Sequence, residues 1–462
     1  MAMIKPSTEL TKPASEETPV TKILAEFVAE FKSARLPVEV RHQVARGLVN
    51  WAGCAIGGSR HPAVTNALAA FGPFMGIGQS SILGRSERVD ALHAALFNGI
   101  SSHVLDFDDT HHATLVHPSG PVLSAMLALA QFQTIDGPTF VESIALGIEV
   151  ECRIALGVCP AHYDIGWHVT STVGGFGAAA AVGYALKLNA KQMAWAFGIA
   201  ATQASGLREV FGTMCKSLHP GRAAQSGLSA ALMARAGFTS SERVIEAPRG
   251  FARVMSTHAH LNDTIEGLGE KWVVMDNAFK PYACGLVIHP VIDGCISLYA
   301  KQLFKPQEIA SLHLRVNPLV VELTGKPQPT TGLEGKFSVY HSAAIVLLTG
   351  FSTSKHYTDS AVRGDDVTAL RKKVTVEVDT SIRVDEAHIT VTLQDGATHH
   401  HHVDHALGSL ERPMSDANLN QKFIDLVSDI LPASQVNDAL KQCWQVNTLP
   451  DAGVLGTLLS TG

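Results

Sequence analysis

A long series of helical patterns between residues 21 and 271 is the feature that most constrains the fold of this chain. Apolar residues recur with a period near 3.6, which predicts helices over residues 37–56, 89–104, 122–132, 140–156, 174–186, 190–206 and 223–236. Another helix is expected to begin at Thr239, where Glu242 would complete a capping box. We find no strand pattern in this region, which therefore predicts an all-helical domain.

The pattern changes after about Lys271. Alternating, β-branched segments predict strands over 309–316, 374–378 and 388–393, and Asp395-Gly396 predicts a hairpin turn into a strand over 397–403. Ser415 should cap a helix that runs to Leu431, and residues 435–459 are again helical in pattern. The chain is therefore expected to be mainly α, with an α+β segment before a C-terminal tail that returns to the helical domain.

Composition excludes several classes of protein. Hydrophobic residues make up 46% and charged residues 17%, which is typical of a globular chain, and residues 1–20 are interpreted as a flexible arm. The apolar run 174–186 is too short to span a membrane. The formal charge of −6, with no cluster of Lys or Arg, does not favour nucleic acid as a partner. Seven scattered cysteines without a Cys-x-x-Cys pair favour a reducing cytoplasm.

Histidine is abundant, with 22 residues, but the spacings do not match a known metal motif. The run His399–His402 lies on a predicted strand, so His399 and His401 should share one face and His400 and His402 the other. We interpret the run as a solvated strand and predict no metal site.

A dense polar cluster interrupts the apolar helical region. Three carboxylates and four imidazoles lie between His103 and His117, and buried ionised groups need partners or a functional reason. The alternative is that Asp108 and Asp109 cap the following helix. Pro118-Ser119-Gly120 would begin that helix, and its free amides could bind a carboxylate.

Other bases and cations are predicted at helix starts. His168 lies within Gly166–Thr172, and Lys216 lies within Cys215–Arg222, before the helix expected at Ala223. Lys280 lies within Phe279–Gly285, at the entry to the α+β segment.

The glycine-rich segment 175–180 could alternatively be part of a dinucleotide-binding site. Gly175–Ala180 matches G-x-G-x-x-A after the strand-like segment 168–173, but no acidic residue follows Gly175 until Glu209. We therefore interpret these glycines as helix-packing contacts. The sequence also lacks a P-loop and a Gly-x-Ser-x-Gly elbow.

Six ordered motifs, LDFDDTH, HPSG, GWH, CKSLHPGRAA, FKPYACG and RPMSDANLNQKF, together resemble the MmgE/PrpD family across nearly the whole chain. The resemblance implies a helical domain over 21–271 and 411–462, and an α+β lid domain over 272–410. It also implies a homodimer that acts on a small polycarboxylate without an organic cofactor. Activities in the family include 2-methylcitrate dehydratase, cis-aconitate decarboxylase and iminodisuccinate epimerase.

The resemblance, together with the polar cluster and the helix start at Ser119, assigns site residues. The predicted catalytic residues are Asp106, His117, His168, Lys216 and Lys280, and the predicted substrate-binding residues are His103, Thr110, Ser119 and Tyr282. Lysines and helix N-termini can neutralise carboxylates while a neutral imidazole removes a proton. We expect His117 to be the base and Asp106 to orient it.

Departures from the family pattern bear on the reaction. Gly285 stands where an animal-type decarboxylase would have histidine, and Val321 where it would have tyrosine. Leu115-Val116 stands where a dehydratase would have Trp-Gly. We therefore expect an epimerase of a dicarboxylate such as iminodisuccinate. The alternatives are a hydro-lyase of the 2-methylcitrate dehydratase type, then a decarboxylase and, in another class, a non-catalytic helical binding protein.

Overall fold

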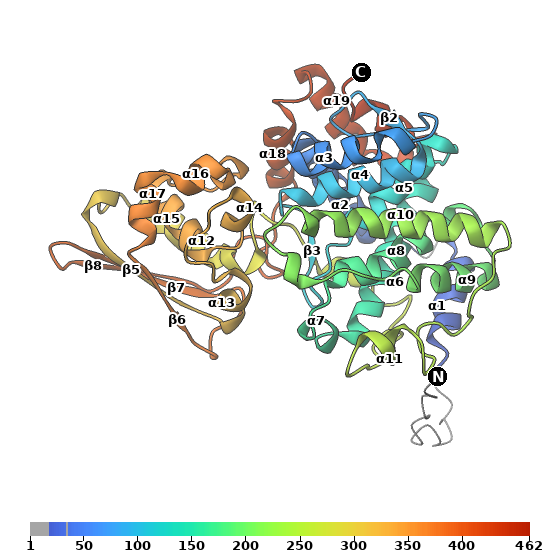
Figure 1. Cartoon of the computed structure of the whole chain (residues 1–462), viewed down its shortest axis with the longest axis horizontal. Coiled ribbons are helices and arrows are strands. Elements are labelled where there is room, and N and C mark those ends of the chain that lie inside the picture. The colour runs from blue at the N-terminus through green and yellow to red at the C-terminus, as the bar shows by residue number, and fades with distance from the viewer. Residues whose placement is uncertain (1–17, 34–35) are drawn as a thin grey trace, which may run out of the picture.

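The computed structural model describes residues 18–33 and 36–462, so most of the predicted N-terminal arm, residues 1–17, lies outside it. Figure 1 shows a helical domain beside a smaller α+β lid domain, with the C-terminal helices packed on the helical domain. This agrees with the mainly α fold class expected from the sequence. Val20 begins the first described helix and is buried, so the end of the expected arm is folded.

The helical domain is built around α8, which is buried along almost its whole length. Its other helices are α1 (Val20–Ala29), α2 (Val38–Gly58), α3 (Pro62–Phe71), α4 (Ala91–Val104), α5 (Ser119–Phe132), α6 (Gly137–Val158), α7 (Ala161–Asp164), α9 (Ala190–Ala201), α10 (Cys215–Arg235) and α11 (Phe251–Met255), with α8 itself spanning Val169–Ala185.

Glycines let three of these helices approach one another closely. A Cβ atom on Gly177 of α8 would lie 2.8 Å from the carbonyl oxygen of Gly147 on α6. A Cβ atom on Gly227 of α10 would lie 2.6 Å from the carbonyl oxygen of Gly175 on α8. Real Cβ atoms do not come so close to backbone oxygens, so these positions need glycine. The glycine-rich stretch therefore packs helices, as predicted.

Three sequence-based expectations for this domain were wrong. Residues 169–173 belong to α8 and are not strand-like. Helix α10 begins at Cys215, with Pro220 inside it, whereas we placed its start at Ala223 because proline usually ends a helical pattern. No helix begins at Thr239, where the chain forms turns.

Short strands occur in the helical domain, where none was expected, and in the segment that follows it. The strands β1 (Ser80–Ser81) and β2 (Arg88–Val89) pair with each other, and β3 (Thr110–His111) pairs with β4 (Asn277–Ala278). Two residues are too few to give an alternating pattern, so the sequence carried no sign of them. The pairing of β3 with β4 ties the polar cluster to the segment that leads into the lid.

The lid domain contains a sheet in the order β6-β5-β7-β8. Its strands are β5 (Ile309–Val316), β6 (Val374–Val378), β7 (Ala387–Leu393) and β8 (Thr398–Val403), and only the β5–β6 pair is parallel. Its helices are α12 (His289–Ala300), α13 (Pro318–Thr324), α14 (Gly332–Gly335), α15 (Val339–Thr349), α16 (Asp359–Arg363) and α17 (Asp365–Arg371). The predicted strands are present, with small shifts in the bounds of β7 and β8.

Because side chains alternate along each strand, one face of the sheet packs against the core of the lid domain. Ile389 and Val391 of β7 are buried against α12, where a Cβ on Gly294 would lie 2.2 Å from Cδ1 of Ile389. His399 and His401 of β8 are half-buried, whereas His400 and His402 are exposed. The expected division of the histidine run between two faces is therefore confirmed.

The chain returns to the helical domain through α18 (Asp416–Val427), α19 (Ala433–Trp444) and α20 (Val454–Leu458). The side chain of Ser415 caps α18, as predicted, by accepting a hydrogen bond from the backbone N–H of Asn418. Within the described residues, no helix is both long enough and apolar enough to cross a membrane.

Candidate active site

A cavity lined by residues of both domains lies where the helical domain meets the lid. The helical domain contributes mostly polar and aromatic side chains, from Asp106, Thr110, Leu115, His117, Tyr163, His168, Phe211 and Lys216. The other wall consists of Lys280, Gly285, Leu286, Val287, Leu323, Thr324 and Phe337. A concave site with a few converging polar groups in a largely apolar wall is typical of small-molecule binding.

Asp106 joins two lysines at this cavity. Its Oδ1 atom accepts a hydrogen bond from Lys216 Nζ at 2.7 Å and another from Lys280 Nζ at 3.2 Å. Asp106 directly follows the end of α4 and has φ of 51°, a left-handed conformation that aspartate tolerates better than most residues. The turn thus aims the carboxylate at both ammonium groups.

Burial and charge set the protonation of this triad. Burial alone would raise the pKa of Asp106, but Lys216 and Lys280 outweigh it and hold that pKa well below its usual value. Burial lowers the pKa of Lys216, and Asp106 offsets this only in part. For Lys280, the nearby Asp106 and Asp108 overcome burial and raise the pKa. The triad therefore supplies positive charge for an anionic ligand.

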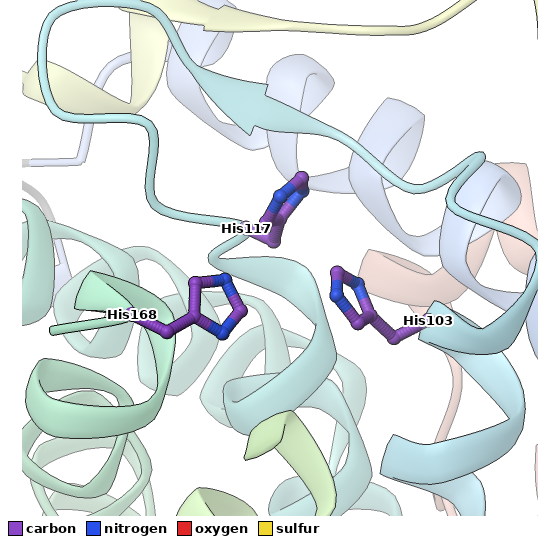
Figure 2. A group of neighbouring side chains, drawn as sticks. All are labelled: His103, His117 and His168. Carbon is purple, nitrogen blue, oxygen red and sulfur yellow. The ribbon is translucent and has the colours of Figure 1, made fainter. Parts of the chain in front are cut away.

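Three imidazoles converge beside the triad, from the end of α4, the loop before α5 and the start of α8 (Figure 2). The ring centroids of His103 and His117 are 4.7 Å apart, and those of His117 and His168 are 6.1 Å apart. His117 and His168 line the cavity, whereas His103 lies outside its lining. His117 and His168 are therefore the imidazoles that could touch a ligand.

His117 is oriented by backbone and hydroxyl oxygens. Its Nδ1 atom lies 2.9 Å from the carbonyl oxygen of Asp109 and 3.2 Å from Oγ1 of Thr110. Because a carbonyl can only accept, Nδ1 carries the hydrogen and Nε2 is left as the basic nitrogen. Burial keeps the pKa of His117 well below its usual value, so the ring is neutral at pH 7. We had expected Asp106 to orient this ring; Asp106 pairs with the lysines instead.

His168 has a histidine partner. Its Nδ1 atom lies 2.7 Å from Nδ1 of His219, so one ring must donate and the other accept. Burial lowers the pKa of both rings, to about 4 for His219 and well below the usual value for His168. The pair is therefore neutral, and the contact couples the tautomers of the two rings, since only one Nδ1 can carry a hydrogen.

The remaining acidic residues of the cluster lie behind the cavity. Asp108 Oδ2 is 2.7 Å from Nδ1 of His103, and Asp109 accepts from Ser119 Oγ at 2.6 Å and from the Asn277 amide. Burial raises the pKa of Asp109 to about 6. The alternative that Asp108 and Asp109 cap the next helix was wrong, since α5 has no side-chain cap.

Three predicted substrate-binding residues lie outside the cavity lining. Each is hydrogen-bonded to a carboxylate instead. His103 bonds to Asp108 and Ser119 to Asp109, and the Tyr282 hydroxyl donates to Asp293 at 2.5 Å. The start of α5 was expected to bind a carboxylate, but residues 118–120 are absent from the cavity wall. Thr110 and the five predicted catalytic residues all line the cavity.

Several residues that support the site were missed. The ammonium group of Lys422, on α18, donates to the carbonyl oxygens of Phe107 at 2.6 Å and Lys280 at 2.8 Å. Phe211 and Phe337 each lie 5.0 Å from Lys216 Nζ, in cation–π contact. Lys422 lies in the RPMSDANLNQKF motif and His219 in the CKSLHPGRAA motif, and this was the only sign of them in the sequence. Their contacts depend on long-range packing.

The three imidazoles were also considered as metal ligands. One nitrogen from each of His103, His117 and His168 lies within 4.8 Å of the others. The partners on Nδ1 leave the Nε2 atoms as the possible ligands, but the ammonium groups of Lys216 and Lys280 face the same cavity. This charge opposes a cation there, and the same groups suit a carboxylate.

Fold and site together define a two-domain protein, α and α+β, with a cavity between the domains that is lined by lysines and histidines. Two family models match the chain, the MmgE/PrpD N-terminal domain over residues 22–264 and the MmgE/PrpD C-terminal domain over residues 282–446. The chain belongs to the MmgE/PrpD family.

Several proteins similar to this chain carry the name cis-aconitate decarboxylase. Cis-aconitate decarboxylase of Homo sapiens is 30% identical over 399 residues, which cover 82% of each chain. The enzyme of Mus musculus with the same name is 29% identical over 400 residues, 82% of this chain and 81% of that one. Cis-aconitate decarboxylase of Aspergillus terreus is 24% identical over 482 residues, 98% of each chain.

Proposed function

We propose that this protein is a lyase that removes CO₂ from a small unsaturated tricarboxylic acid of the cis-aconitate type. The observation that carries the proposal is the cavity in which Lys216, Lys280 and Asp106 lie beside two neutral imidazoles. The names of the relatives support this reaction over the epimerase that we expected from Gly285 and Val321.

Decarboxylation of such an acid leaves the electron pair of the broken C–C bond on the substrate, where it must be stabilised. As the bond to the departing carboxylate breaks, its electron pair shifts the double bond and one proton is added to carbon. Lys216 and Lys280 would bind the remaining carboxylates and stabilise the developing negative charge. The reaction therefore consumes one proton, and no other reactant is needed.

His117 is the proposed proton donor, with Nε2 directed at the substrate. Burial depresses its pKa, but the carboxylates of a bound substrate would raise it, because nearby anions favour the protonated ring. The ring would then take up a proton with the substrate and deliver it to carbon. Thr110, at 3.2 Å from Nδ1, would help to fix the orientation of the ring.

A dehydratase of the 2-methylcitrate type is the second candidate. The observation in its favour is that both lining imidazoles, His117 and His168, are neutral, as a general base must be. One ring would remove a proton while another group protonates the departing hydroxyl.

The test is to incubate the protein in D₂O with cis-aconitate, 2-methylcitrate or iminodisuccinate and to follow each by NMR. We expect cis-aconitate to lose CO₂ and to gain one deuterium on carbon. Loss of water from 2-methylcitrate alone would favour the second candidate. Deuterium exchange with racemisation of iminodisuccinate, without loss of CO₂ from cis-aconitate, would contradict the proposal. The Lys216→Met variant is the matched inactive control.

A further inference from the structure

The histidine run on β8 and the strand opposite it form a group of imidazoles on the outer face of the lid sheet. Strands β7 and β8 pair so that His388 lies directly opposite His402. The two rings stack with centroids 4.2 Å apart and planes 8° apart. The side chain of His402 is 42% exposed and that of His388 is 21% exposed, so both ring edges can be reached from solvent.

Glu386, just before β7, adds a carboxylate to this pair. Its Oε1 atom lies 2.9 Å from Nε2 of His402 and 3.8 Å from Nε2 of His388. Zinc bonds of about 2.0–2.1 Å in a tetrahedral site put ligand atoms roughly 3.3–3.4 Å apart. The two Glu386 distances bracket this spacing, and all three ligand atoms lie within 4.8 Å of one another. Because a bound ion lies near the plane of each imidazole, the stacked rings would turn about their Cβ–Cγ bonds to share it.

Nε2 of His402 and Oε1 of Glu386 are hydrogen-bonded to each other, so an ion would replace the shared hydrogen, while two neighbouring arginines contact other oxygens. Arg383 contacts the other carboxylate oxygen of Glu386, Oε2, at 3.3 Å. Arg315, opposite His388 on β5, pairs with Asp379 at 3.7 Å.

We propose that Glu386, His388 and His402 form a surface site for one divalent late first-row metal ion, with Zn²⁺ as the best fit. Two imidazoles and a carboxylate are a common ligand set for zinc, and a water molecule would complete the tetrahedron. The ion would link β7 to β8 on the outer face of the sheet. The site is separate from the cavity at Asp106 and does not depend on the proposed lyase activity.

A second group nearby, Asp385, His405 and Glu411, has similar spacing. It offers one imidazole and two carboxylates, a harder ligand set than two imidazoles and one carboxylate. Imidazole suits zinc better than carboxylate does, so this group is the weaker candidate. His405→Gln serves as a control that distinguishes the two groups.

Side chains along β8 alternate between the two faces of the sheet, so histidines of the same run that lie on the other face serve as matched controls. The test titrates ZnCl₂ into the full-length protein, without any affinity tag, and follows binding by calorimetry. We expect one zinc per chain. His388→Gln and His402→Gln should each weaken binding by more than ~10-fold, since loss of even an outer-shell partner costs about 10–100-fold. His399→Gln and His401→Gln, on the other face, should bind zinc as the wild type does.

A second measurement separates metal binding from folding. Zinc should raise the thermal midpoint of the wild type and not that of Glu386→Gln, while the metal-free midpoints stay equal. Three results would overturn the proposal: no saturable zinc binding by the wild type, equal loss in all four histidine variants of the two strands, or unchanged binding in His388→Gln and His402→Gln. Loss of binding in His405→Gln alone would place the ion in the other group and would also overturn it.

Discussion

Lys216 donates a hydrogen bond to Oδ1 of Asp106 across 2.7 Å, although 110 residues separate the two in the sequence. Lys280 reaches the same oxygen at 3.2 Å, so one buried carboxylate serves two ammonium groups. The contact joins the turn after α4, the start of α10 and the segment that enters the lid. The charge of the cavity and the position of the lid are therefore coupled through Asp106.

Replacing Asp106 with asparagine should damage both stability and activity. Asn tolerates the left-handed backbone, so the change removes the charge and leaves the turn. Two buried ammonium groups would lose their anion, and breaking a buried pair in this way costs about 3–5 kcal/mol. The measurement is urea denaturation together with kcat. Asp429→Asn, in an exposed pair with Lys355, is the control and should change stability by less than ~0.5 kcal/mol.

His117→Gln tests the proposed proton donor. Gln keeps much of the size and hydrogen bonding of the ring, but it cannot titrate. We expect kcat to fall at least ~100-fold, within the ~10²–10⁴-fold range usual for general acid–base catalysis, with little change in the thermal midpoint. His258→Gln, on the exposed surface, should leave kcat unchanged. Near-normal turnover with a lowered midpoint would mean that His117 is structural, and His168 would then be examined next.

His219 should act as a positioning residue for His168. His219→Gln retains a hydrogen-bonding group, whereas His219→Phe has none, so the two variants separate packing from the Nδ1 contact. We expect kcat to fall in both, with partial recovery in the Gln variant and little change in KM. Equal loss in both variants would indicate that only the shape of the ring matters.

Lys422 should stabilise the site from the C-terminal tail. Lys422→Met leaves three buried oxygens, on Asn50, Phe107 and Lys280, without their donor. A buried polar group without a partner costs about 1–3 kcal/mol, so we expect a loss of about 3 kcal/mol or more in the free energy of unfolding. Lys441→Met, exposed on α19, should have almost no effect. Equal stability of the two variants would show that the Lys422 contacts contribute little.

Stability should fall as the pH is lowered from 7 to 5. Burial lowers the pKa of seven buried histidines, which are His111, His117, His162, His168, His219, His289 and His341. Below about pH 6.5 the unfolded chain protonates these rings while the folded protein does not. Each such ring can therefore remove up to ~1.4 kcal/mol of stability per pH unit.

Buried carboxylic acids with raised pKa values oppose this loss of stability. Burial raises the pKa of Asp109 to about 6 and also raises the pKa values of Glu149 and Glu151. These groups bind protons in the folded state first, so they stabilise it as the pH falls. Seven histidines outnumber three acids, and urea denaturation at pH 7, 6 and 5 should show a net loss. A constant or rising free energy of unfolding would contradict these assignments.

The sequence predicted those parts of the fold that local patterns determine. Strands β5 and β6 have the predicted bounds because their residues alternate, whereas Pro220 concealed the first two turns of α10. The cavity residues were recovered from motifs, but their partners were not. Lys422 is 315 residues from Phe107, and no local pattern can predict contacts over such a separation.

The most direct test of the central claim follows the carboxylate carbon itself. Cis-aconitate labelled with ¹³C in each carboxyl group is incubated with the wild type and with His117→Gln, and the released ¹³CO₂ is measured by mass spectrometry. The proposed lyase predicts one ¹³CO₂ per substrate consumed by the wild type and at least ~100-fold slower release by the variant. Absence of ¹³CO₂ from the wild type, while it racemises iminodisuccinate, would contradict the decarboxylase assignment.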